Sequence, residues 1–170
     1  MAQKRQKKKA IRRATAKPGS RTASASRKKP SRKPLDVQQQ VFRVFAEQAD
    51  SLWNGLADQC RQFAYGFNQV VGVPALHVLA EPTRLRVAYP QADAELLFQF
   101  DKTERYVQAW MNTGCATYGS CQADLLPVGL TVRGQELRFA LRGDVTSDER
   151  LAVTLLKQLT SGIVEAVVEQ

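Results

Sequence analysis

Residues 84–101 read RLRVAYPQADAELLFQFD and carry the strand pattern from which the fold class follows. Large apolar side chains recur at every second position in two runs, at Leu85, Val87 and Tyr89 and again at Leu96, Phe98 and Phe100. A period of two is typical of strands that bury one face. Such strands predict an antiparallel sheet with one side against a core and the other in solvent.

Further strands are expected on both sides of this stretch. Leu76–Leu79 predicts an opening strand, and Tyr106–Asn112 continues the alternation. Residues 130–141 predict a hairpin that turns at Arg133-Gly-Gln-Glu136, because glycine permits the backbone angles of a tight turn.

Two amphipathic helices are expected around the strands. Asp36 offers a capping carboxylate to a long helix, which we expect to stop in the region marked by Gly66, Gly72 and Pro74. Thr146-Ser-Asp-Glu149 has the form of a capping box before a second helix. The apolar residues of that helix recur at helical spacing and include Leu151, Leu155, Leu156, Leu159, Ile163, Val164, Val167 and Val168.

The order of these elements predicts the fold class α+β. We expect a two-layer sandwich in which an antiparallel sheet of about five or six strands carries the N-terminal and the C-terminal helix on one face. Residues 35–170 are expected to form a single domain. The order of elements is similar to that of small bacterial secretion chaperones, a similarity of architecture alone.

Residues 1–34, here called the tail, differ sharply in composition from the rest of the chain. The tail carries fourteen Lys or Arg and no acidic residue, whereas residues 35–170 carry eleven basic and sixteen acidic residues, a net charge of −5. Its main basic clusters are Lys4, Arg5, Lys7, Lys8 and Lys9; Arg12 and Arg13; Arg27, Lys28 and Lys29; and Arg32 and Lys33. With almost no large apolar residue, the tail is expected to be disordered when free.

A flexible cationic chain binds phosphate backbones without reading their sequence. We therefore expect a non-enzymatic protein that associates with DNA or RNA through the tail. The alternatives are that the tail serves localisation or solubility, or that it is drawn to an acidic protein or a membrane surface. In those cases the folded part would act as a protein-interaction or chaperone-like module.

A second anion surface is a weaker expectation. If the apolar residues of the strands face the core, Arg84, Arg86, Arg138 and Arg142 point the other way. Whether these four arginines are neighbours depends on strand order. The alternative is a solvated face whose arginines pair with nearby carboxylates.

The first helix has an apolar surface that is wider than one sheet face requires. Phe42, Ala46 and Trp53 are candidates for contact with a second copy of the chain or with a client protein. The alternative is that all three pack in the core.

Catalytic and cofactor chemistry has little support in the sequence. We expect no enzyme activity, no cofactor and no metal site, because the chain has one histidine, His77, and no phosphate loop or nucleophile elbow. Cys60, Cys115 and Cys121 are expected to be reduced thiols, although Cys115 and Cys121 are close enough in sequence to pair. No apolar run reaches the length of a membrane span. A cytoplasmic protein is expected, associated with the nucleoid or ribosomes, or a nuclear one in a eukaryote.

Overall fold

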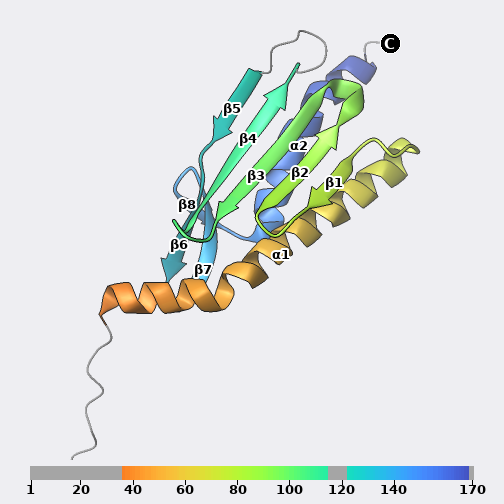
Figure 1. The fold of residues 1–170 in the computed structure, drawn as a ribbon. Helices are drawn as coiled ribbons and strands as arrows, with labels where there is room; N and C mark the ends of the chain where they lie inside the picture. The colour runs from red at the N-terminus through yellow and green to blue at the C-terminus, as the bar shows by residue number, and fades with distance from the viewer. Residues whose placement is uncertain (1–35, 115–121, 169–170) are drawn as a thin grey trace, which may run out of the picture. The chain divides into compact units, whose positions relative to one another are not determined.

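The computed structural model describes residues 36–114 and 122–168 (Figure 1). The predictions for the tail and for Cys115 and Cys121 lie outside these residues. Neither helix in the described part of the chain has the length and apolarity that crossing a membrane requires.

Helix α1 spans Val37–Val71. Its N-cap is the predicted one, since the Asp36 carboxylate accepts a hydrogen bond from the Gln38 amide at 3.4 Å. It ends at Gly72, which adopts φ 76° and donates its N–H to the Asn68 carbonyl at 2.9 Å. A left-handed residue after the last turn favours glycine, because glycine has no Cβ. Of the predicted stop signals, Gly66 lies within the helix and Gly72 terminates it.

The first sheet has five antiparallel strands in the order β1-β2-β3-β4-β5. Their bounds are β1 His77–Ala80, β2 Arg84–Tyr89, β3 Ala94–Asp101, β4 Tyr106–Thr113 and β5 Gln122–Leu126, with the short 3-10 helix η1 at Pro90–Ala92. The predicted alternation is confirmed, since Leu85, Val87, Leu96 and Phe98 are fully buried. Consecutive strands are neighbours, so the sheet is a simple meander.

A second, separate sheet has three antiparallel strands in the order β6-β7-β8. They span β6 Val128–Arg133, β7 Glu136–Leu141 and β8 Asp144–Thr146. The hairpin predicted for residues 130–141 is β6–β7, turning at Gly134-Gln135. The five-stranded sheet matches the predicted sheet of about five or six strands, whereas a separate sheet containing the hairpin was not predicted. Pro127 separates β5 from β6, has no N–H to continue a ladder, and accepts a hydrogen bond from the Arg142 amide through its carbonyl at 2.8 Å.

Helix α2 spans Asp148–Val168, and its cap differs by one residue from the predicted box. The Ser147 hydroxyl, not that of Thr146, accepts the Arg150 amide at 3.1 Å. The Ser147 carbonyl also accepts the Leu151 amide at 2.9 Å. Asp148 and Glu149 follow in the first turn, where negative charge is favoured by the helix dipole.

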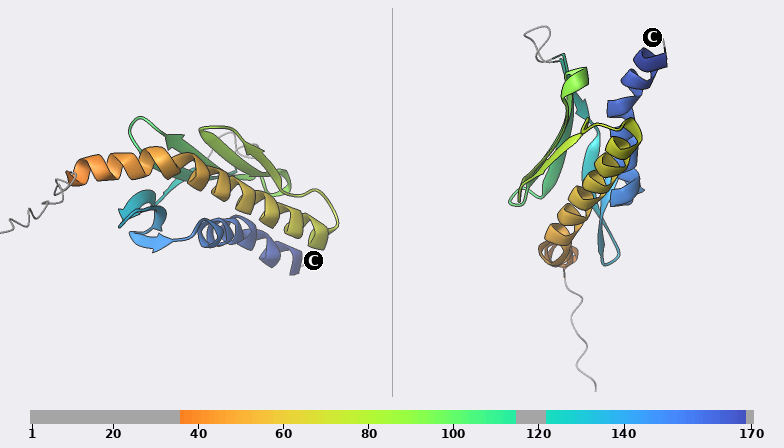
Figure 2. Two further views of the ribbon diagram at one scale, coloured as in Figure 1. Left: turned by 90° about the horizontal axis from the view of Figure 1, so that it is seen from below. Right: turned by 90° about the vertical axis from the view of Figure 1, so that its right-hand side faces the viewer.

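The two helices lie against one another on one face of the five-stranded sheet, as predicted for an α+β sandwich (Figure 2). The core between the layers contains Leu56 and Cys60 from α1, Phe98 from β3 and Leu151 from α2, all essentially inaccessible to solvent. Phe139 brings the second sheet into the same core. The opposite face of the five-stranded sheet is left uncovered by the helices (Figure 2).

Two side-chain amides fasten α1 to the strands. Asn68 accepts the amides of Ala75 and Leu76 at 2.9 and 2.8 Å and donates to the Leu76 carbonyl at 2.9 Å. Gln48 donates to the Gln135 carbonyl and accepts the Leu137 amide, both at 2.8 Å, as a neighbouring strand would. The backbone groups just before β1 and at the edge of β7 thus have hydrogen-bond partners.

Candidate anion-binding site

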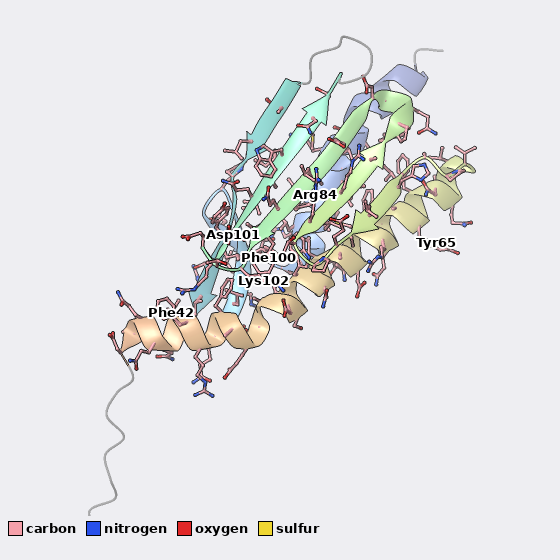
Figure 3. All side chains as sticks on the ribbon, viewed as in Figure 1. Phe42, Tyr65, Arg84, Phe100, Asp101 and Lys102 are labelled. Carbon is pink, nitrogen blue, oxygen red and sulfur yellow. The ribbon has the colours of Figure 1, made fainter. Side chains whose placement is uncertain are left out.

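The arginines predicted to form a second anion surface are divided between the two sheets. Arg84 and Arg86 lie on β2, whereas Arg138 lies on β7 and Arg142 in the β7–β8 turn. Arg84 is labelled on the five-stranded sheet in Figure 3. The side chains of all four are exposed, but strand order separates the first pair from the second.

Arg86 is held by a carboxylate on the neighbouring strand. Its Nε donates to Glu95 Oε2, and Asn112 Nδ2 donates to Glu95 Oε1 at 2.8 Å. Partial burial acts to raise the pKa of Glu95, but these two hydrogen bonds and the positive charges of Arg86 and Arg84 outweigh it, so the pKa is lowered. Glu95 therefore stays ionised at neutral pH and offsets the charge of Arg86.

Replacing Glu95 with glutamine is expected to make the fold less stable at neutral pH and to change the acid side of its stability profile. The folded pKa of Glu95 lies below its unfolded value, so the carboxylate stabilises the fold above that value and loses this effect as pH falls through the folded pKa. The wild type should therefore melt above Glu95→Gln at neutral pH, with the gap closing as pH falls through the ordinary pKa of a glutamate carboxyl and then through the lower pKa of Glu95 in the fold. Thermal unfolding across a pH series measures the gap, and a gap independent of pH would contradict the assignment.

Arg138 lies in acidic surroundings. Its guanidinium bonds to Glu136 on the same strand, at 2.5 and 3.1 Å. The same cleft, of about 540 Å³, is also lined by Glu47 and Asp148. Carboxylates therefore outnumber the single arginine, and the pairing expected for a solvated face describes Arg138 better than an anion site does.

Arg142 lies in a different cleft, of about 460 Å³, which we call the arginine cleft. The cleft lies between the β5–β6 junction at Pro127, the β7–β8 hairpin and the first half of α2. Arg142 and Arg150 are its two cations, Asp144 is its one carboxylate, and Thr146, Thr154 and Gln158 add polar groups. Within the described residues neither guanidinium forms an ion pair. This cleft has a net positive charge, unlike the cleft around Arg138.

Arg150 was missed by the sequence analysis. It is the third residue of α2 and directly follows the predicted capping box, where no sequence pattern singled it out. Its proximity to Arg142 follows from the short β8 strand, which turns the chain back so that the hairpin and the helix start line the same cleft.

The other titratable candidates do not form a catalytic arrangement. Burial raises the pKa of the Cys60 thiol to about 12, so this thiol is protonated at neutral pH and inert as a nucleophile. His77 is exposed at the start of β1. Asp101 accepts the amides of Thr103 and Glu104, both at 2.9 Å, and so shapes the β3–β4 turn. Among the described residues no three His, Cys, Asp or Glu side chains are grouped to hold a metal ion.

The predicted contact surface on α1 is only partly exposed. Trp53 is 3% exposed and stacks on Phe100 with ring centroids 5.3 Å apart, so its assignment to a partner surface was wrong. Phe42 is 45% exposed, and the Arg105 guanidinium lies 3.7 Å from the centre of its ring. Ala46 is exposed. Figure 3 shows Phe42 on the first turns of α1, away from Phe100 at the end of β3.

Comparison of this chain with protein-family models, with curated proteins and with solved structures found no match.

Proposed function

We propose that this chain is a non-enzymatic protein that associates with DNA or RNA through its tail. The observation that carries the proposal is the separation of charge, with fourteen cationic and no acidic residues in the first 34 positions and a net charge of −5 in the remainder. Polyanion affinity is therefore concentrated in the tail, because each Lys or Arg that neutralises a phosphate releases a condensed counterion. Contacts of this kind are independent of base sequence.

In this proposal the folded unit, residues 35–170, supplies self-association or a protein contact. Phe42 and Ala46 on α1 are the exposed members of the surface proposed for it. A dimer would present two tails to one nucleic acid and raise avidity without any new contact. Location at the nucleoid, at ribosomes or in a nucleus is part of the same proposal.

The second candidate function is a protein-interaction or chaperone-like module whose tail serves localisation or solubility. The uncovered face of the five-stranded sheet supports it, because Leu79 on β1 and Leu125 on β5 are 57% and 64% exposed there. Trp110 lies on the same face of β4, between Leu97 and Leu125 in the strand register. These apolar side chains, with Arg86 between Leu79 and Leu97 in the register, would be the contact surface for a client.

Deleting residues 1–34 separates the two functions. We expect full-length protein to bind mixed-sequence duplex DNA and structured RNA, and the truncated protein to bind at least about a hundredfold more weakly near 0.1 M salt. Fluorescence anisotropy measures both affinities, and circular dichroism checks that the truncated protein is folded. Unchanged affinity in the folded, truncated protein would place binding in the folded unit, and no binding by the full-length protein would reject the proposal.

A further inference from the structure

We propose that the arginine cleft binds a phosphate group, and that in the nucleic-acid complex this is a phosphate of the backbone. The inference rests on the proposed function and deepens it. The tail would supply many interchangeable contacts, whereas the cleft would add one at a fixed place on the folded unit.

Charge and ion pairing together distinguish the arginine cleft from two other clefts. The cleft around Arg138 is lined by Glu47, Glu136 and Asp148, and its arginine is paired with Glu136. A third cleft, of about 330 Å³, is lined by Asp50, Arg61, Glu81 and Lys102, with no net charge. In that third cleft both cations also form ion pairs with carboxylates.

In the third cleft, Lys102 pairs with Asp50 and Arg61 pairs with Asp58. In the arginine cleft, by contrast, Arg142 and Arg150 face one carboxylate, Asp144, and form no ion pair with any described residue. Two unpaired guanidinium groups in one concave site suit phosphate oxygens, because their planar N–H donors match that geometry. Thr154 lines the same cleft and its hydroxyl can donate a further hydrogen bond, whereas the Thr146 hydroxyl already donates to the Ser147 carbonyl at 3.4 Å.

The backbone at Arg142 gives independent support. Leu141 pairs with Asp144, so the β7–β8 turn has two central residues, Arg142 with φ 55° and Gly143 with φ 86°. Positive φ at both central residues defines a type I′ turn, whose first central position favours Asn, Asp or Gly. An arginine there is in a strained backbone conformation, because its Cβ crowds the chain in the left-handed region.

In two other residues with positive φ, a side-chain contact or the residue type accounts for the conformation. Arg105, at φ 59°, has its guanidinium 3.7 Å from the centre of the Phe42 ring, a contact that contributes to the fold. Asp93, at φ 51°, is a residue type that tolerates this region. The Arg142 amide donates to the Pro127 carbonyl at 2.8 Å, but the Arg142 guanidinium forms no ion pair or ring contact with a described residue. A strained arginine whose side chain does not stabilise its own turn is the pattern expected at a binding site.

The test compares three variants of the full-length chain. Arg142→Asn and Arg150→Gln each remove one cation from the cleft. Arg133→Gln is the matched control, since Arg133 is exposed at the end of β6 and lies outside the residues that line the cleft. Each protein is titrated by fluorescence anisotropy with a mixed-sequence duplex across a salt series.

Each cleft variant is expected to bind about five- to tenfold more weakly near 0.1 M salt, with a slope of log K against log salt that is smaller by about one. Arg133→Gln should bind like the wild type. Arg142→Asn should also melt about 3 °C higher, because asparagine suits the turn. A variant that is more stable and binds more weakly cannot owe its lost affinity to misfolding.

Amide signals of Gly143 and Arg150 provide a second readout, recorded by NMR with inorganic phosphate and with matched sodium chloride. If the wild type binds DNA and the cleft variants match Arg133→Gln, the cleft inference is wrong while the proposed function stands. If the wild type does not bind DNA but phosphate shifts these signals, the proposed function fails and the cleft is a site for free phosphate. If neither ligand has an effect, both fail.

Discussion

Raising the salt concentration from about 50 to about 200 mM is expected to weaken binding of the full-length chain to duplex DNA by about 10³- to 10⁵-fold. This range corresponds to roughly six to ten phosphate contacts, fewer than the fourteen cations that the tail carries. The physical reason is entropic, since each contact releases a counterion into solution and the gain shrinks as the salt concentration rises. Anisotropy titrations at several salt concentrations measure the slope directly.

Two tail variants serve as controls for this prediction. A tail with the same residues in shuffled order should keep both affinity and slope, because backbone contacts depend on charge and not on residue order. A tail with its fourteen Lys and Arg residues changed to glutamine should lose the salt-dependent binding. Loss of affinity in the shuffled tail would instead show recognition of a defined tail structure, and a flat salt dependence of the wild type would contradict phosphate binding.

Replacing Trp53 with alanine is expected to lower the free energy of unfolding by about 3–5 kcal/mol. Trp53 is 3% exposed and stacks on Phe100, and its indole Nε1 donates to the Glu81 carbonyl at 3.0 Å. One side chain of α1 thus contacts β3 and the turn that leads into β2, so its removal leaves a cavity at the junction of three elements. Denaturant unfolding followed by circular dichroism measures the loss.

Trp53→Phe is the matched control. Phenylalanine retains an aromatic ring against Phe100 but has no donor for the Glu81 carbonyl. Loss of this hydrogen bond is expected to lower the free energy of unfolding by about 1 kcal/mol, in addition to the effect of the smaller ring. If Trp53→Ala lowered the free energy of unfolding by less than about 1 kcal/mol, the change would be too small for a buried aromatic residue. That result would contradict the placement of Trp53 in the core and favour its place on the partner surface of α1.

Elements with a strong local signal were predicted well. The alternation through Leu85 and Phe98 placed β2 and β3 with the correct faces buried, and Asp36 capped α1 as expected. The second sheet was not predicted as separate. The ladder breaks at Pro127, and a proline between two apolar strands does not reveal whether the next strand rejoins the same sheet.

The candidate site was predicted in part. Arg142 was among the four arginines expected to face solvent, but whether it neighbours Arg84 and Arg86 depended on strand order, which places Arg84 and Arg86 in the five-stranded sheet and Arg142 beside β7 and β8. Arg150, which lines the same cleft, lies in the first turn of α2 and was not predicted as a site residue. The assignment of Trp53 to a partner surface was wrong for a related reason. A wide apolar surface on a helix does not show which of its residues pack against the sheet of the same chain.

Four features follow from the sequence alone: the separation of charge between the tail and residues 35–170, the fold class, the inward residues of the main strands and the N-cap of α1. These depend on composition and on repeats of two or 3.6 residues, which are local properties of the chain. Three others follow from the three-dimensional arrangement: the strands divide into two sheets, Trp53 is buried, and Arg142 and Arg150 line one cleft. Those facts depend on pairing between segments distant in the chain, which no local period encodes.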